Sequence, residues 1–406
     1  MSFLKTRLSI MMFLQYAIWG SWTTALAAHL SKIGYSGPQI GAIYGCLWLA
    51  CMIAPFIGGQ IVDRFFPTQL FLAAAHLIGA VLLFLTSKAA VPGEYNKMWW
   101  LMFAYSLFYA PTLALTNSLS FHNLKDPEGE FPKIRMWGTP GWIFVGWLVL
   151  FVRHFWQTEN WAGGSDLLMI AAGCSLLMGL FCLALPHTPP KREGENPFAF
   201  LEALQMLKDK NFFIFVLVSF VITTELQFYY IPTAPFLIDM GSPEKYVAAI
   251  KTVAQIAEFF VMWLLLHRSM KRFGVRKTMA IGILAWPLRY FLFCIPNLGV
   301  VIASLTLHGF GYAFFFVASQ IYVNMKAQDD MRASAQAMLT FFTLGLGNFL
   351  GTMFTGWIWG VFGGPAHTVW WKFFMVPAGL CLVMGIIFLL FFKDDVKAGE
   401  GQADAA

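Results

Sequence analysis

The chain has 406 residues, of which 58% are hydrophobic and 12% are charged, and its mean hydropathy is +0.65. A soluble protein of this length would carry about twice that share of charged residues. The composition therefore excludes a soluble globular protein and indicates a chain that crosses a membrane many times.

Apolar segments of helix length follow one another along the whole sequence. The first begins after Lys5 and Arg7 and has no small-residue cleavage site, so we expect a retained helix and not a signal peptide. Because backbone polar groups find no partners in lipid, each segment is predicted to be helical. Twelve such segments cover residues 8–30, 39–62, 69–88, 98–120, 138–156, 166–186, 211–236, 247–267, 278–295, 298–324, 333–361 and 367–392.

The basic residues predict the orientation of these helices. With both termini placed in the cytoplasm, 19 of the Lys and Arg residues lie on the inner side and 7, among them Arg153 and Lys251, on the outer side. Because cytoplasmic loops carry the excess of Lys and Arg, both termini are predicted to be cytoplasmic. The same bias explains the net charge of +6 without a nucleic-acid partner.

The longest polar connection, residues 187–210, divides the predicted helices into six and six. We therefore expect an N-terminal bundle over 1–186, a cytoplasmic linker over 187–210 whose second part forms an interfacial helix, a C-terminal bundle over 211–392 and a cytoplasmic tail over 393–406. This layout resembles that of major facilitator transporters. In such folds the substrate binds near the midplane between the two halves.

Two carboxylates fall deep within predicted membrane spans, Glu225 and Glu258. Charged side chains are costly there and usually face a cavity or a partner. Glu258 follows Gln255 by three residues, so both point from one helix face and can offer an amide and a titratable oxygen to one ligand. The alternative for both acids, and for Glu225 in particular, is a structural carboxylate tied to arginine or backbone.

The segment TTELQFYYIPTAP adds further polar groups to the seventh predicted helix. Gln227 and Tyr230 share a face, whereas Glu225 lies about 200° from Gln227 around the helix axis and is expected in different surroundings. Pro232 is expected to bend this helix.

Two arginine residues are candidates to pair with these carboxylates. Arg135 precedes Thr139 and Trp142 at the spacing of one helical stripe. Arg289 lies inside the ninth predicted helix. The alternatives are that Arg135 marks the cytoplasmic boundary and that Arg289 extends to the headgroups.

The second half contains one more deeply placed titratable group, His308, for which the alternative is a hydrogen-bonded packing residue. Trp142 and Tyr312 are rings on which a planar heterocycle could stack while amides read its edge. Asn117 adds an uncharged polar group to an apolar span and should find a partner or a cavity there.

The patterns expected of an enzyme are absent from the sequence. The six cysteines fall inside apolar segments, which predicts neither a disulfide framework nor a metal site. We find no Ser/His/Asp constellation, no Gly-rich phosphate loop and no soluble domain large enough to signal. We therefore expect no catalytic residue and no cofactor.

Several segments, in order along the chain, resemble the bacterial nucleoside–proton symporters of the major facilitator superfamily. The link after the second predicted helix, Gly59-x-x-x-Asp63-Arg64, resembles the loop signature of the superfamily, although a solvated charge pair is the alternative. The segments that resemble the nucleoside family are FLQYAIWGSW, PTLALTNSLSF, FPKIRMWGTPGW, ELQ, QIAE, AWPLR and RASAQAM.

The resemblance implies a twelve-helix carrier that imports nucleosides with protons. It also implies that base and ribose are held by Arg135, Thr139, Trp142, Gln227, Gln255 and Glu258, with Tyr230, His308 and Tyr312 as further candidates. Asp63, Arg64, Asn117 and Arg289 are predicted to serve gating or structure.

The chain departs from the family pattern at three positions. Tyr230 stands where an amide is expected, His308 where a tyrosine is usual, and Ala313 where an acid linked to proton coupling or gating is expected. The coupling role therefore moves to Glu258, Glu225 or His308, or is lost.

The leading hypothesis is a monomeric nucleoside importer of the bacterial inner membrane that works by alternating access and binds a proton as its second partner. A carrier for sugars or another small polar metabolite is the alternative within transport, because the same polar and aromatic side chains suit sugars. A membrane-embedded enzyme or sensor is the remote alternative.

Overall fold

The computed structural model describes residues 3–57, 65–190, 198–328 and 331–395. Within these ranges the chain forms helices and contains no strand. Nine helices of this part are long and apolar enough to cross a membrane, and Asp166–Cys182 is a shorter apolar helix. The expectation of an all-helical membrane protein is confirmed, whereas the number of twelve spans stays a prediction.

The chain divides into two compact units. The first comprises 1–197 together with 230–238 and 242–252, and the second comprises 198–229, 239–241 and 253–406. The first unit contains α1 (Phe3–Thr23), α2 (Leu26–Lys32), α3 (Gly37–Ile57), α5 (Thr68–Ala89), α6 (Tyr95–Asn123), α7 (Pro127–Arg135), α8 (Gly138–Trp156), η2 (Thr158–Asn160) and α9 (Asp166–Cys182).

The second unit begins with a short helical segment, α10 (Ala199–Glu202) and the 3-10 turn η3 (Ala203–Lys208), in the second part of the predicted linker. It continues with α11 (Lys210–Tyr230), η5 (Met262–Leu266), α14 (His267–Phe293), α15 (Leu298–Ser304), α16 (Leu307–Gly311), η6 (Tyr312–Val317), α17 (Ala318–Lys326), α18 (Arg332–Thr340), η8 (Phe341–Gly347), α19 (Asn348–Val361) and α20 (Trp370–Phe391). Three elements carry the remaining segments of the first unit: most of α12 (Thr233–Asp239), η4 (Glu244–Tyr246) and the start of α13 (Val247–Val261).

Large apolar side chains cover the outer surface of both units. Trp263, Leu390 and Phe155 are between 62% and 68% exposed. Contiguous apolar surface of this kind is unfavourable in water and favourable against acyl chains. The exposure pattern therefore agrees with helices that face lipid.

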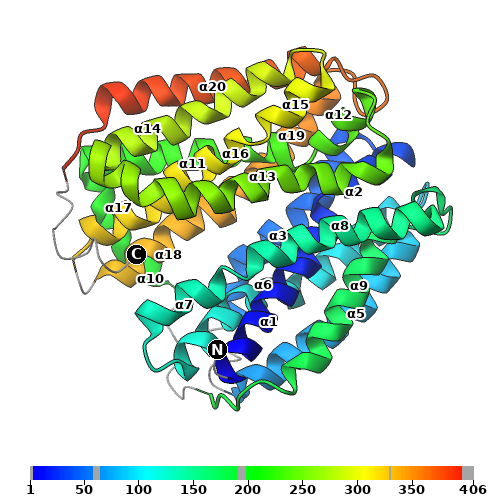
Figure 1. The fold of residues 1–406 in the computed structure, drawn as a ribbon, viewed down its shortest axis with the longest axis horizontal. Helices are drawn as coiled ribbons and strands as arrows, with labels where there is room; N and C mark the ends of the chain where they lie inside the picture. The colour runs from blue at the N-terminus through cyan, green and yellow to red at the C-terminus, as the bar shows by residue number, and fades with distance from the viewer. Residues whose placement is uncertain (1–2, 58–64, 191–197, 329–330, 396–406) are drawn as a thin grey trace. The chain divides into compact units, whose positions relative to one another are not determined.

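Close helix contacts in the first unit depend on small residues. The helix α1 packs against α8, and α5 packs against α9 (Figure 1). A side chain at Gly141 would collide with the backbone carbonyl of Phe13, so only glycine permits this approach of α8 to α1.

Helices of the second unit also approach one another closely at glycine residues. In Figure 1 α14 and α20 run side by side, and α14 also contacts α16. Gly309 faces the backbone of Ala257, and Gly351 faces the carbonyl of Thr224. In the sequence Gly347 and Gly351, and then Gly356 and Gly360, are four residues apart, a spacing that lets helices approach closely, and the second contact fits this packing role.

Several helices are interrupted where the sequence changes character. The helix that carries TTELQFYY ends at Tyr230, and α12 begins at Thr233, so the bend expected at Pro232 is present. Gly274, with φ 75° and ψ 175°, interrupts α14 between the predicted spans 247–267 and 278–295. The π-helical turns η5, η6 and η8 also lie in the second half of the chain, and such turns are frequent at functional sites.

Candidate functional site

A chain of three polar side chains from three helices lies inside the second unit. Arg289 of α14 and His308 of α16 are 0% exposed, and the Glu258 side chain of α13 is 13% exposed. Arg289 Nη1 lies 3.2 Å from His308 Nδ1, and His308 Nε2 lies 3.8 Å from Glu258 Oε2. Because a guanidinium only donates, His308 Nδ1 must accept, and its ring proton sits on Nε2, toward the Glu258 carboxylate.

Aromatic rings enclose the Arg289 guanidinium. Its central carbon lies 4.2 Å from the ring centre of Tyr229, 4.6 Å from that of Trp286 and 4.9 Å from that of Tyr290. Ring faces attract a cation, most strongly where water is excluded. Arg289 is therefore held deep within the unit and does not extend to the headgroups.

His308 is also fixed by stacking. Its ring lies 4.9 Å from that of Tyr229 and 5.8 Å from that of Tyr312, with 26° between the planes of His308 and Tyr312. Tyr312 begins the π-helical turn η6 and is half-buried. Ala313, the residue at the expected position of an acid, is 0% exposed in the same turn.

The two amide side chains of the predicted site lie in different surroundings. Gln255 is 7% exposed, and its Oε1 is buried and meets no hydrogen-bond donor among the described residues. Gln227, 1% exposed, donates from Nε2 to Asn348 Oδ1 at 2.7 Å. The sequence did not single out Asn348 as a site residue, because it lies in a glycine-rich helix whose pattern predicts a packing surface.

Glu225 lies in different surroundings from Gln227, as their angular separation indicates. It is 0% exposed. Its neighbours include Arg289, Tyr290 and Cys381, and its backbone carbonyl accepts a hydrogen bond from the Tyr290 hydroxyl at 3.1 Å.

Tyr230 is the last residue of α11, three positions after Gln227, and is the residue at which the first unit resumes. Its backbone carbonyl accepts a hydrogen bond of 2.9 Å from Lys251 Nζ. Lys251 is 2% exposed, a degree of burial that its place on the predicted outer side of the membrane does not indicate. Because it lies at the end of a predicted span, the sequence did not distinguish an inward lysine from a boundary lysine.

Three other residues of the predicted site, Arg135, Thr139 and Trp142, belong to the first unit. Arg135 ends α7, donates from Nη2 to the Tyr16 hydroxyl at 2.5 Å and lies 4.2 Å over the Tyr16 ring. Thr139 and Trp142 follow in α8, after a break at residues 136–137. Trp142 is 8% exposed and packs edge-on against Trp19, with 5.3 Å between the ring centres.

The gating candidates are only partly described. Asp63 and Arg64 lie outside the residues that the structure describes. Asn117 is half-buried in α6. The gating roles of all three stay predictions.

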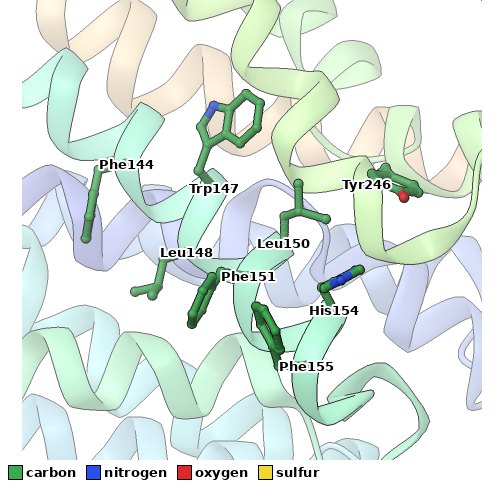
Figure 2. A pocket seen from close by; sticks show the side chains of 8 residues that line it. All are labelled: Phe144, Trp147, Leu148, Leu150, Phe151, His154, Phe155 and Tyr246. Carbon is green, nitrogen blue, oxygen red and sulfur yellow. The ribbon is translucent and has the colours of Figure 1, made fainter.

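An open hollow of about 570 Å³ lies along α8 and holds none of the predicted site residues. Figure 2 shows that Phe144, Trp147 and Phe151 line it, with His154 and Tyr246 at one end. Trp147 is 53% and Phe151 52% exposed. Since polar groups are few and the rings face outward, this hollow fits acyl chains better than a polar substrate.

Comparisons with known proteins agree with these features. The family described as Nucleoside H+ symporter matches residues 1–397. YegT of Escherichia coli (strain K12), whose description as a nucleoside transporter is provisional, is 35% identical over 403 residues, covering 96% of this chain and 93% of the relative. The nucleoside permease NupG of the same organism is 29% identical over 412 residues, covering 96% of each chain.

Solved structures show the same fold. The crystal structure of the nucleoside transporter NupG matches with a TM-score of 0.84 and 28% identity, covering 97% of this chain and 100% of that chain. The D-xylose–proton symporter matches with a TM-score of 0.70 and 12% identity over 99% of each chain, which is a likeness of fold alone. The chain is a membrane transporter with the major facilitator fold and belongs to the nucleoside H+ symporter family.

Proposed function

We propose that this protein imports nucleosides together with protons, as a monomer in the bacterial inner membrane, by alternating access of its two six-helix halves. The observation that carries the proposal is the match of the nucleoside H+ symporter family to residues 1–397. The named relatives NupG, a nucleoside permease, and xanthosine permease support the same substrate class.

Gln255 and Glu258 bind the nucleoside in the second unit. The hydroxyl groups of ribose and the amino groups of a base are hydrogen-bond donors, and both side chains present acceptor oxygens. Gln255 Oε1 is buried and meets no donor among the described residues, a state that costs roughly 1–3 kcal/mol. A bound nucleoside removes this cost, which favours a ligand rich in donors.

The remaining binding residues add amide groups, hydroxyl groups and rings. Gln227, held by Asn348, presents its amide oxygen, and Tyr312 offers a ring for stacking. From the first unit Arg135, Thr139 and Trp142 contribute, and Tyr230 and His308 complete the set of candidates.

Proton coupling uses the pair formed by Glu258 and His308. An imidazole that presents Nε2–H toward a carboxylate at 3.8 Å can share a proton with it when the two groups approach. Such a pair supplies the titratable group that Ala313 does not provide. Glu225, a second buried carboxyl group, is the reserve candidate.

Binding of a ligand panel to purified protein tests the proposal. Calorimetric titration with purine nucleosides, pyrimidine nucleosides and monosaccharides, at pH 5.5 and pH 8, should give binding by nucleosides alone and different affinities at the two pH values. Binding of sugars in place of nucleosides would make the protein a sugar carrier. Affinity for nucleosides that is independent of pH would count against proton coupling through this site.

A further inference from the structure

A small pocket of about 80 Å³, lined by hydroxyl and amide groups among apolar side chains, lies inside the second unit and includes Tyr312, which stacks on His308. It is bounded by α11, by η6 with α17, and by α18 with η8. Tyr312 is the one titratable residue among the described residues that line it. The pocket is far too small for a nucleoside, although Tyr312 and Asn348, which belong to the binding proposed above, line one part of it.

Two buried hydroxyl groups in the wall of this pocket have no protein partner. Ser219 is 1% and Ser319 2% exposed, and neither Oγ has a hydrogen-bond partner among the described residues. A buried polar group without a partner costs roughly 1–3 kcal/mol, so native proteins usually supply a partner or a water. Because a water occupies about 30 Å³ in the liquid, the pocket has room for two or three.

The pocket lies between the titratable pair and one end of the unit. Tyr312, at one side, stacks on His308, which faces Glu258. Gln320, at the other side, is exposed and lies eight positions along the same helical stretch, a rise of about 12 Å. This stretch then ends at Lys326, on the side of the membrane that the basic residues predict to be cytoplasmic.

We propose that this pocket holds a short chain of waters through which protons pass between the Glu258–His308 pair and the cytoplasm. The proposal rests on the proton-coupled function argued above. A proton leaves the Glu258 carboxyl group for a neighbouring water, which releases one of its own protons to the next water. Only O–H and N–H bonds form and break, and the Ser219 and Ser319 hydroxyl groups hold the waters because each can both donate and accept.

The charged and titratable groups around the path are consistent with this role. At the end of the path near Glu258 and His308, the neighbouring groups are Arg289, Tyr229 and Glu225. At the cytoplasmic end Lys326 pairs with Asp209 and Asp395, and the Asp209 carboxylate can receive a proton. The Lys326 ammonium holds the pKa of Asp209 below its usual value, so Asp209 releases a received proton readily to solvent.

The test separates proton movement from nucleoside movement in proteoliposomes. Ser219→Val and Ser319→Val each remove one hydroxyl group and fill part of the pocket. Uptake driven by a pH gradient, and proton entry reported by an enclosed pH dye, should each fall about tenfold, which corresponds to ~1.4 kcal/mol on the barrier. Nucleoside counterflow, which needs no net proton transfer, and the nucleoside Kd should stay at wild-type values.

Two controls make the result specific. Ser304→Val changes a serine that is equally buried in the same unit, but whose hydroxyl group donates to the Val301 carbonyl away from the pocket, and it should leave all readouts unchanged. Ser319→Thr keeps the hydroxyl group and should retain most of the proton-driven uptake.

The alternative outcomes are distinct. Equal losses of counterflow and proton-driven uptake would make the pocket a part of the nucleoside site or of the packing, and would overturn the water path. Wild-type proton entry in both valine variants would also overturn it while leaving the proposed function intact. Absence of nucleoside counterflow in the wild-type protein would instead refute the proposed function.

Discussion

At the scale of single residues, the arrangement of Arg289, His308 and Glu258 determines what the second unit can do. Arg289 can only donate hydrogen bonds, so it fixes the tautomer of His308 and directs the Nε2 proton to Glu258. The aromatic rings around Arg289 keep the guanidinium away from water. Glu258 therefore faces the Nε2–H group of His308, and the protein, not the solvent, fixes the position of that proton.

The binding role of Glu258 leads to a direct prediction. Glu258→Gln removes the charge of an acceptor that binds ligand hydroxyl groups, so the nucleoside Kd should rise by a factor that corresponds to about 1–3 kcal/mol. Isothermal titration of the purified variant measures it. Glu225→Gln is the matched control, because it changes a second buried carboxyl group that lies about 200° from Gln227 around the helix and is not among the proposed binding residues, and the nucleoside Kd of this variant should stay near the wild-type value. A wild-type Kd for Glu258→Gln would remove α13 from the binding site.

The sequence indicated several of these residues but few of their partners. Glu258 and Gln255 stood out because polar groups are rare in apolar spans and shared one helix face. The pairs Gln227–Asn348 and Arg289–His308 join residues 121 and 19 positions apart. Helix periodicity gives the face of each side chain but not which neighbouring helix lies opposite, so these contacts were beyond prediction from one sequence.

At the scale of elements, helix packing depends on where side chains are absent. The glycines of α8, α16 and α19 meet backbone atoms of neighbouring helices directly. The sequence indicated such contacts through glycine spacing in α19. It could not indicate Gly141, which belongs to no spaced pattern and is explained only by the position of Phe13.

Substitution of Gly141 tests this account of packing. Gly141→Ala places a methyl group against the Phe13 carbonyl, so α1 and α8 must separate, and the unfolding temperature in detergent should fall. Gly173→Ala in α9 is the matched control, because a methyl group there meets no atom within 4 Å. Alanine favours a helix by up to about 1 kcal/mol over glycine, so this control should keep or raise the unfolding temperature. Equal losses in both variants would refute the packing argument.

A buried ion pair connects α8 to the start of α9. Arg153, 1% exposed, contacts Asp166, 5% exposed, through two hydrogen bonds of 2.7 and 2.8 Å. The sequence does not predict this ion pair, because the partner lies beyond a connection whose path the sequence does not specify. Thr158 also donates to Asp166, at 2.8 Å.

Removal of one member of this pair should destabilise the first unit strongly. Arg153→Met leaves the Asp166 carboxylate buried without its cation, which costs about 3–5 kcal/mol of unfolding free energy. The double variant Arg153→Met with Asp166→Leu removes both charges and should recover much of the loss. Titration of the purified proteins with SDS measures both values. A double variant as unstable as Arg153→Met alone would contradict the pairing argument.

At the scale of the whole molecule, the bilayer explains why the fold class was predictable. Lipid requires every backbone group in a span to be paired within the chain, so long apolar segments can only be helices. The family followed from ordered motifs and is shown by the match over residues 1–397. The clustering of 230–238 and 242–252 with the first unit was not predicted, because the pattern of apolar residues shows where a helix lies but not which other helices its ends contact.

The most direct test of the central claim, that nucleoside and proton enter together through the Glu258–His308 pair, is the internal pH of proteoliposomes after nucleoside is added outside. The account predicts acidification that accompanies nucleoside uptake, that sugars do not produce, and that is lost in Glu258→Gln. Nucleoside uptake without acidification in the wild-type protein, or undiminished acidification in Glu258→Gln, would contradict it.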